Sequence, residues 1–230
     1  MNLTSWLFYR YYLQNKTLHQ NLFNDSGHSH GSCGVIKKLR RHGKSRHTKT
    51  YGEHRGQISI SNIIHERPLE AQQRGEVGHW EVDTVVGKSG GSCLVNMVDR
   101  KTCYLLTKKA DYKRALSVNQ AMGQLMDTLP NKIFKTMTPD RGSEFAKHAE
   151  ITKDRLVLFY FPDAYAPWQR GSNENINGLL REYMPKEQDL SQFSDKAIAT
   201  FAQKINTRLR KCLSWKTPYE VFYQQALHLI

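Results

Sequence analysis

Three acidic side chains, Asp83, Asp140 and Glu174, stand where carboxylates could share a metal ion. Asp83 lies within a β-rich run, and Glu81 two residues earlier points to the same side of the strand. Asp140 follows a short strand and opens a glycine-containing turn, and binding sites collect at such strand ends in α/β sheets. Two ionised carboxylates about 4 Å apart repel each other by roughly 4 kcal/mol at an effective dielectric constant near 20. Three of them in one place therefore need a counter-ion.

Divalent cations relieve this repulsion, and ligands that are all oxygen favour Mg²⁺ or Mn²⁺ over zinc. Two such ions about 3.5–4 Å apart promote in-line displacement at a phosphodiester, because one activates the nucleophile and the other stabilises the leaving oxygen. The carboxylates thus predict phosphoryl transfer on nucleic acid with two Mg²⁺ (or Mn²⁺) ions. Single acids on strands are more often surface residues, so the prediction depends on a fold that brings the three together.

The residues from Pro167 onward predict a loop that leads into the helix carrying Glu174. Proline and glycine punctuate the loop, and Ser172 is a suitable N-cap. One apolar face follows at helical spacing, formed by Ile176, Leu179, Leu180 and Tyr183. Glu174 falls nearly opposite that face, in the first turn, where a carboxylate can also serve only to complement the helix dipole.

The pattern between these motifs predicts a mixed α/β domain with five strands. Its order is three strands, helix, strand, helix, strand and then the helix of Glu174. If the first and fourth strands are neighbours, Asp83 and Asp140 approach one another and Glu174 comes over them. The expected strands are His79–Val86, Ser92–Asp99, Cys103–Thr107, Phe134–Thr138 and Leu156–Phe161. Further helices are expected over 118–129, 145–151, 198–205 and 218–227.

The chain of 230 residues carries a formal net charge of +13, which favours a polyanionic partner. Nucleic acid is preferred to a membrane surface, because no apolar run approaches the ~20 residues that span a bilayer. Residues 1–13 lack the basic start of a signal peptide. The four cysteines are far apart with no CxxC pair, so neither a zinc cluster nor a disulfide framework is indicated. The expected setting is the cytoplasm.

Residues 1–77 are expected to form a basic, partly irregular extension, and residues 78–230 the core with its C-terminal helices. The run 37–49 is dense in positive charge and nearly free of apolar residues, which suits either a flexible arm on phosphates or a solubilising linker. We expect residues 56–74 to be a tether. The arm residues expected to contact DNA are Lys37, Lys38, Arg40, Arg41, Lys44 and Arg46.

The segments that carry the three acids are Gly78-His79-Trp80-Glu81-Val82-Asp83-Thr84, Asp140-Arg141-Gly142-Ser143-Glu144-Phe145 and Trp168-Gln169-Arg170-Gly171-Ser172-Asn173-Glu174-Asn175. Together with the tail 206–220 they closely resemble a bacterial insertion-sequence transposase of the IS-thirty family, a group similar in its core to retroviral integrases. The likeness is strong from about residue 78 to residue 222. The motifs occur in the family's order, with 33 residues between Asp140 and Glu174.

The resemblance implies a ribonuclease-H-like fold and a catalytic, Mg²⁺-binding triad of Asp83, Asp140 and Glu174. It implies cleavage of DNA at transposon ends and strand transfer into target DNA. A homo-oligomer associated with the nucleoid of a bacterial cell is expected by analogy. The choice of Asp83 over Glu81 rests on the resemblance, because strand geometry allows either.

Two departures from the family pattern bear on this expectation. Val82 stands where Gly is usual and points away from Asp83. Arg141 stands where Asn is usual, and its guanidinium could pair with Asp140, in competition with metal, or with the scissile phosphate.

Most of the helix-turn-helix segments that precede the core in the family are missing, so the resemblance implies an N-terminally truncated copy, with residues 1–77 as a remnant of the DNA-binding region. Two alternatives follow. One is a DNA-binding remnant with impaired catalysis, and the other is a metal-dependent nuclease of the same fold that never joins strands.

Several residues around the motifs have both a functional and a structural interpretation. The expected DNA contacts are Trp168, Arg170, Asn173 and Arg181. Their structural alternatives are a hydrophobic lid, a solvated charge and an ordinary helix cap. The residues expected to be structural are Asp99 in a turn, His79 and Trp80 in strand packing, and His148 facing solvent.

Overall fold

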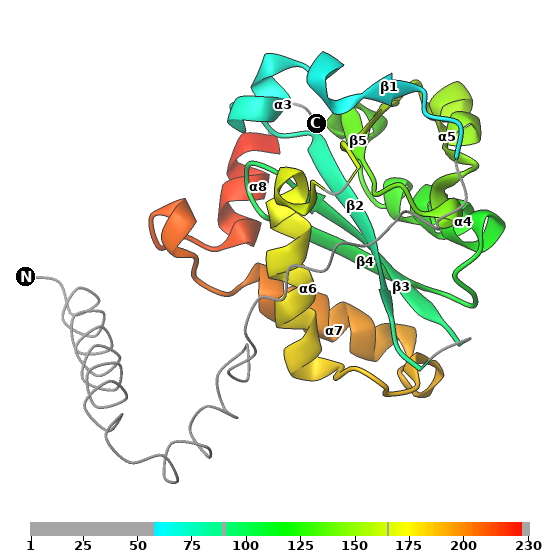
Figure 1. The fold of residues 1–230 in the computed structure, drawn as a ribbon. Coiled ribbons are helices and arrows are strands. Elements are labelled where there is room, and N and C mark those ends of the chain that lie inside the picture. Colours follow the sequence, from blue (N-terminus) through cyan, green and yellow to red (C-terminus); the bar gives the residue numbers. More distant parts are fainter. Residues whose placement is uncertain (1–57, 89–90, 165, 227–230) are drawn as a thin grey trace, which may run out of the picture. The chain divides into compact units, whose positions relative to one another are not determined.

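A six-stranded mixed sheet lies at the centre of the structure (Figure 1). The computed structural model describes residues 58–88, 91–164 and 166–226. The strands follow the order β1-β6-β5-β2-β3-β4 across the sheet. They are β1 (Asn62–Ile63), β2 (His79–Val86), β3 (Cys93–Asp99), β4 (Leu105–Ala110), β5 (Thr136–Thr138) and β6 (Leu158–Phe161).

Strand β2 connects the two halves of the sheet. On one side it begins the antiparallel meander β2–β3–β4, and on the other β5, β6 and β1 continue the sheet in parallel. β2 pairs with β5 through residues 79–81 opposite residues 136–138. The first and fourth expected strands are therefore neighbours, which the predicted meeting of Asp83 and Asp140 requires.

The sheet has six strands rather than the five expected from the sequence. All five expected strands are present, and the additional one is β1, which pairs Asn62 with Tyr160 and Ile63 with Phe161. A strand of two residues is too short to show an alternating pattern, so the sequence carried no signal for it.

Residues 58–74 are packed against the sheet, so the expectation of a tether is wrong for this stretch. η1 (Ile64–Glu66) and α3 (Leu69–Gln73) follow β1. Ile64 and Ala71 are buried, and Ile58 and Ile60 pack against the main core. Ile63 and Leu69 are exposed, so the packing of this stretch depends on the other four apolar residues.

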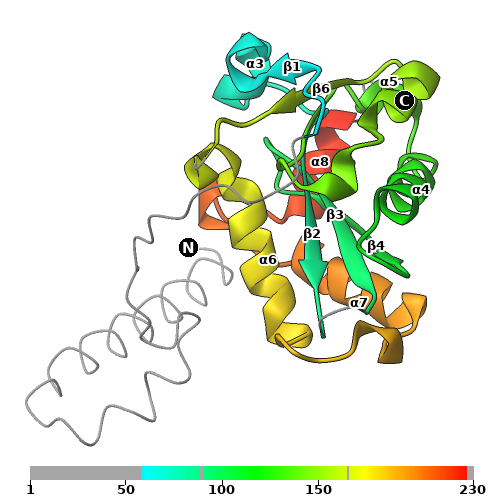
Figure 2. The ribbon, with the colours of Figure 1, turned by 45° about the vertical axis from the view of Figure 1, so that its right-hand side comes forward.

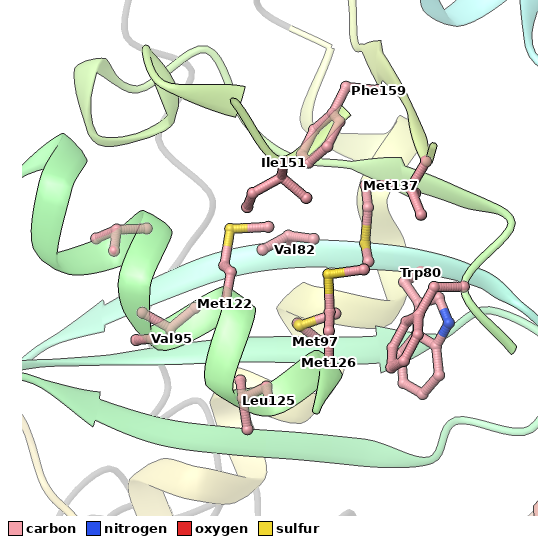
Figure 3. Close-up of a cluster of buried hydrophobic side chains, with 14 of the residues drawn as sticks. Trp80, Val82, Val95, Met97, Met122, Leu125, Met126, Met137, Ile151 and Phe159 are labelled. Atoms are coloured by element: carbon pink, nitrogen blue, oxygen red, sulfur yellow. The ribbon is translucent and has the colours of Figure 1, made fainter. Parts of the chain in front are cut away.

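The face of the sheet that carries Trp80 and Val82 is covered by three helices (Figures 1 and 2). They are α4 (Ala115–Met126), α5 (His148–Arg155) and α8 (Pro218–Ala226). Met122, Leu125 and Met126 of α4 lie over this face (Figure 3). Val82, the departure from the family pattern, is fully buried here and contributes to packing.

The opposite face of the sheet carries a second apolar core beneath α6 (Gly171–Tyr183) and α7 (Asp195–Asn206). Val85 of β2 belongs to it, together with Ile176 and Leu180 of α6. Because side chains alternate along a strand, Glu81 and Asp83 lie on the same face as Val85, under α6. The apolar stripe predicted for the helix of Glu174 is the face that packs here.

The remaining helical segments differ from expectation mainly at their ends. The helix expected over 145–151 is split into η3 (Ser143–Phe145) and α5, and His148 is buried rather than solvent-facing. Its Nδ1 lies 3.0 Å from the Phe145 carbonyl oxygen, and its ring packs on Phe161. The short 3-10 segments elsewhere are η2 (Asn131–Ile133), η4 (Pro167–Arg170), η5 (Leu190–Gln192) and η6 (Lys211–Leu213).

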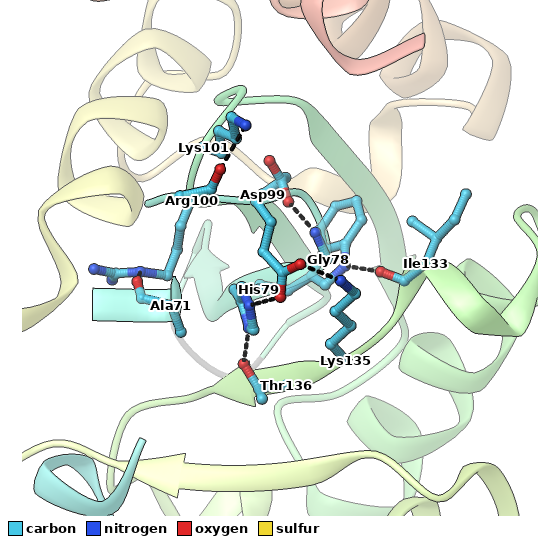
Figure 4. Close-up of polar contacts among 12 residues, drawn as sticks. Ala71, Gly78, His79, Asp99, Arg100, Lys101, Ile133, Lys135 and Thr136 are labelled. Atoms are coloured by element: carbon cyan, nitrogen blue, oxygen red, sulfur yellow. Dashed lines mark hydrogen bonds and ion pairs between the residues drawn. The ribbon is translucent and has the colours of Figure 1, made fainter. Parts of the chain in front are cut away.

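The entry into β2 is fixed by polar contacts around Gly78 and His79 (Figure 4). Gly78 has a φ of 110°, and a β-carbon there would lie 2.7 Å from the Ile133 carbonyl oxygen, so only glycine fits. Asp99 accepts hydrogen bonds from the Gly78 amide and from both the amide and the hydroxyl of Thr102. Asp99 is thus the turn-stabilising acid that the sequence predicts.

In the described part of the chain, no helix is long and apolar enough to cross a membrane.

Candidate active site

Asp83 and Asp140 meet where β5 ends beside β2. β5 pairs with β2 only as far as Glu81, so Asp83 lies just beyond the paired segment, and Asp140 follows Thr138 by two residues. Burial raises the pKa of Asp83, the Arg170 guanidinium opposes this rise, and the charge of Asp140 adds to it. The two carboxylates therefore interact electrostatically.

A chain of hydrogen bonds orients the Asp83 carboxylate from the α6 side. The Asn177 amide of α6 donates to Oδ2 of Asp83 at 2.7 Å. Asn96 of β3 donates to the Asn177 oxygen at 3.0 Å, and the Thr107 hydroxyl of β4 donates to Asn96 at 2.6 Å. The Thr84 backbone amide donates to Oδ1 of Asp83 at 2.9 Å. Asp83 is thus positioned by two neighbouring strands and by the helix that carries Glu174.

Glu81, the other acid of β2, has a structural role. It is fully buried, forms an ion pair with Arg100, and accepts a hydrogen bond from the Asn173 backbone amide at 3.0 Å. The structure thereby distinguishes Glu81 from Asp83, which the strand pattern did not.

The start of α6 is capped by this distant carboxylate and not by Ser172. Ser172 is the second residue of the helix, and its hydroxyl is buried without a hydrogen-bond partner. The predicted N-cap is wrong because Glu81, on the strand beneath, satisfies a free amide of the first turn. A contact between residues so far apart in the chain leaves no local sequence signal.

Arg170 lies against Asp83 at the end of η4. Its Nη1 is 3.8 Å from Oδ1 of Asp83, and the side chain is only 16% exposed. Its Nε and Nη1 are buried and have no hydrogen-bond partner. The guanidinium expected to bind a DNA phosphate therefore faces the carboxylate at the centre of the site.

Glu174 is exposed in the first turn of α6, beside the helix face that carries Asn173 and Asn177. Asp83 and Asp140 offer oxygen donors suited to a hard divalent cation, and the burial of Asp83 disfavours its charge unless a cation is near. Within residues 58–88, 91–164 and 166–226, however, no three His, Cys, Asp or Glu side chains are grouped to hold a metal ion. The donor set thus fits such a cation through two carboxylates, and Glu174 is the candidate for the third.

The other expected DNA contacts are placed differently from one another. Trp168 is 73% exposed. Asn173 is buried, and both polar atoms of its side chain have no hydrogen-bond partner. Arg181 donates from Nη2 to the Val86 carbonyl oxygen at 2.7 Å, so one side of its guanidinium is fixed to the end of β2. The basic arm with Lys37, Lys38, Arg40, Arg41, Lys44 and Arg46 lies outside the described residues.

Arg141, the second departure from the family pattern, donates from Nε to the Pro162 carbonyl oxygen at 2.7 Å. This contact directs the guanidinium toward the loop after β6.

Two charged residues at the site were not singled out from the sequence. Glu144 is buried in η3 and forms an ion pair with Lys113, which lies just before α4, at 2.8 Å. The Thr84 hydroxyl also donates to Glu144, at 3.0 Å. The signal for Glu144 was its place four residues after Asp140 in the second motif, whereas Lys113 stands in a polar loop without any motif.

No protein-family model matches the sequence. The transposase InsI of the insertion sequence element IS30A from Escherichia coli K12 is 44% identical over 183 residues, which are 79% of this chain and 47% of that protein. The transposase of the element IS1086 from Cupriavidus metallidurans is 40% identical over 173 residues, covering 75% of this chain and 51% of its own length. The transposase of the element IS4351 from Bacteroides fragilis is 38% identical over 191 residues, which are 82% of this chain and 58% of that protein.

The chain therefore spans about half the length of the transposases that it matches. Across most of its own length it is homologous to transposases of the IS-thirty family, as the motifs predict.

Solved structures of retroviral integrases share the fold. The catalytic core domain of BIV integrase aligns with a TM-score of 0.50 at 18% identity, over 66% of this chain and 97% of that one. A simian T-cell lymphotropic virus intasome, solved in complex with PP2A regulatory subunit B56 gamma, aligns with a TM-score of 0.52 at 17% identity. The alignment covers 72% of this chain and 57% of that one. The expectation of a ribonuclease-H-like fold is confirmed.

Proposed function

We propose that this homologue of insertion-sequence transposases cuts DNA at the ends of a mobile element and joins the freed 3′ ends to target DNA. The observation that carries the proposal is the meeting of Asp83 and Asp140 at the end of β5, next to the helix that presents Glu174. These are the acids that the family motifs assign to catalysis.

Asp83, Asp140 and Glu174 would hold two Mg²⁺ or Mn²⁺ ions, which when bound would activate the attacking oxygen and stabilise the leaving one. The chain itself has to keep the Asp83 carboxylate ionised and aimed. Hydrogen bonds from Asn177 and Thr84 and the charge of Arg170 all favour its ionised form.

The helix α6 has to hold Glu174 at a fixed height above the two aspartates. Its first turn is bound to β2 through the Asn173 amide and the Glu81 carboxylate. Its next turn is bound to β2 and β3 through Asn177. A helix fixed at two successive turns places Glu174 with little freedom along the helix axis, which is the preorganisation that phosphoryl transfer requires.

DNA is the proposed partner, bound through the net charge of +13, the basic arm of residues 37–49 and the exposed Trp168 just before α6. A homo-oligomer on the bacterial nucleoid is part of the proposal, since joining two ends requires two active sites in one assembly.

A DNA-binding protein with impaired catalysis is the second candidate. Arg170 lies beside Asp83, and the described residues hold no group of three ligands. If the exposed Glu174 side chain does not close on the two aspartates, the cation site remains incomplete and only DNA binding is left.

The test is cleavage of supercoiled plasmid and of labelled duplex by the purified protein in Mg²⁺ or Mn²⁺. Cleavage should disappear in EDTA and fall at least about 100-fold, or about 2.7 kcal/mol in barrier, in Asp83→Asn, Asp140→Asn and Glu174→Gln. Asp154→Asn, an exposed acid of α5, is the matched control and should cleave normally.

A second substrate separates transposase from nuclease. Pre-nicked duplex with a free 3′-OH should give joined products if the protein transfers strands. Cleavage without any joined product would favour a nuclease of this fold. No cleavage by folded, DNA-binding protein would favour the catalytically impaired form.

A further inference from the structure

We propose that Lys113 binds a phosphate of the DNA strand at the active site and that Glu144 is the positioning residue that holds it there. The inference rests on the proposed function, because it supplies a substrate contact for that same site. Neither residue belongs to the triad or to the expected DNA contacts.

Glu144 is tied to the strand that carries Asp83. Its side chain is only 4% exposed, and its Oε1 accepts from the Thr84 hydroxyl at 3.0 Å and from Nζ of Lys113 at 2.8 Å. Thr84 directly follows Asp83 in β2, and the two side chains point to opposite faces of the strand. Glu144 therefore fixes Lys113 to the residue next to Asp83.

Glu144 also borders the segment that carries Asp140. A β-carbon built on Gly142 would collide with both Oε2 of Glu144 and Oδ1 of Asp140. The Gly142 amide donates to that same Asp140 oxygen at 2.7 Å. Both carboxylates thus lie against the space that a side chain at 142 would fill, and glycine leaves that space open.

Lys113 is an accessible cation beside these carboxylates. Burial alone would lower its pKa, but the hydrogen bond to Glu144 and the charges of Glu144, Asp140 and Asp83 raise it. Its side chain is 40% exposed, whereas that of Arg170, which also lies by Asp83, is 16% exposed.

An ammonium has three N–H donors, and the contact with Glu144 uses one of them. Lys113 can therefore meet a phosphate oxygen from solvent without leaving Glu144. A phosphodiester that approaches Asp83 and Asp140 is repelled by both, and a lysine at this place offsets the repulsion. Lysine is a common phosphate ligand because it offers a compact point charge.

The first experiment measures the salt dependence of binding to a fluorescent 30-base-pair duplex in EDTA, which does not depend on catalysis. Each lost phosphate contact lowers the slope of log affinity against log salt by about 0.9. We expect that loss in Lys113→Gln, and a slope close to that of the wild type in Lys113→Arg. Lys132→Gln is the matched control. Lys132 is exposed in η2, which precedes β5, whereas Asp140 follows the opposite end of β5, so Lys132 lies away from the site.

A second experiment uses the unaltered protein, so it does not depend on a variant that folds. Lysines are reductively methylated with and without the same duplex, and modification is read by mass spectrometry. DNA should protect Lys113 several-fold and leave Lys132 unchanged. Equal methylation of Lys113 in both samples would show that it is only a structural partner of Glu144.

The role of Glu144 is read from a double-mutant cycle on the binding slope. Glu144→Gln should reduce the slope less than Lys113→Gln, and the double variant should be no worse than Lys113→Gln alone. Additive losses, or an unchanged slope in folded Lys113→Gln, would overturn the inference. If the wild type binds DNA but never cleaves it, the proposed function fails while these readings still decide the role of Lys113.

Discussion

At the scale of single residues, Asp83 is held in a state that reduces the stability of the folded protein. Burial and the neighbouring Asp140 disfavour its charge, and the hydrogen bonds from Asn177 and Thr84 and the charge of Arg170 compensate in part. Ionising a buried carboxylate next to another costs free energy unless a cation lies between them. Binding of a cation at this site is therefore favoured.

Asp83→Asn should raise the midpoint temperature of unfolding at pH 7.5 in EDTA. Because the pKa of Asp83 is raised above its ordinary 3.8, the folded state holds this proton more tightly than the unfolded chain does. Ionisation of Asp83 therefore lowers stability as the pH rises through the raised pKa, and the advantage of the variant should shrink as the pH falls toward 4. Each kcal/mol corresponds to about 2–4 °C in a chain of this size, which differential scanning fluorimetry resolves.

Adding a divalent cation should reverse this difference in stability between the wild type and Asp83→Asn. Mg²⁺ or Mn²⁺ at about 100 times its Kd should stabilise the wild type by roughly 2.7 kcal/mol and the variant far less. A variant less stable than the wild type in EDTA at pH 7.5 would mean that the hydrogen bonds to the carboxylate outweigh its burial.

At the scale of elements, α6 is the part of the site whose position matters most, and a buried ion pair sets it. Glu81 receives the Asn173 amide on one oxygen and the Arg100 guanidinium on the other. Arg100 in turn donates from Nε to the Ala71 carbonyl oxygen of α3. The start of α6, strand β2 and helix α3 are thus joined through two side chains.

Glu81→Gln should destabilise the protein by about 3–5 kcal/mol, because it leaves the buried Arg100 without a countercharge. Urea unfolding measures this loss. Hydrogen exchange should also speed up in the first turn of α6, since a neutral amide holds the Asn173 N–H less strongly.

Glu174→Gln is the matched control. Glu174 directly follows Asn173 in α6, but its side chain is exposed, and the substitution makes the same change of charge without removing a buried ion pair. It should change stability by less than about 0.5 kcal/mol. Equal losses in the two variants would show that the buried pair does not anchor α6.

Sequence reasoning went furthest for elements with a strong periodic pattern. The bounds of β2 and the apolar face of α6 were predictable because each repeats over several residues. β1 and the capping of α6 by Glu81 were not, because a two-residue strand and a contact across 92 positions leave no local pattern. The burial of His148 at the start of α5 also leaves no local pattern, since the rings that it contacts, Phe159 and Phe161, come from β6.

In the site, residue types and motif spacing predicted the three acids, and only the structure shows which side chains contact Asp83. The meeting of Asp83 and Asp140 followed from predicted strand adjacency. The inward position of Arg170 and the pairing of Lys113 with Glu144 depend on side-chain directions that no sequence pattern encodes. The three-acid site therefore remains a prediction, now with two of its members placed together.

At the scale of the whole molecule, residues 58–77 belong to the fold that carries the site. β1 extends the sheet, Ala71 is fully buried, and Arg67 donates from a buried guanidinium to the Thr138 hydroxyl at the end of β5. The boundary between residues 77 and 78 predicted from the sequence marks where the motifs begin.

A chain that begins at Gly78 should therefore be less stable than the full chain. Ile64→Ala in the full chain should cost about 2–5 kcal/mol, since Ile64 is 5% exposed, and the truncation should cost more. Urea denaturation of the three proteins measures both losses. If the truncated chain matches the full one, residues 58–77 are a separable attachment.

Asp83 and Thr84 are adjacent in β2 yet serve opposite layers of the protein, one through Asn177 to α6 and the other through Glu144 to Lys113. The peptide bond between Asp83 and Thr84 therefore fixes the position of the Asp83 carboxylate relative to the Glu144–Lys113 ion pair. Inserting or deleting one residue just before Asp83 would shift Asp83 and Thr84 by one position along β2, so that each would point to the face that the other now occupies.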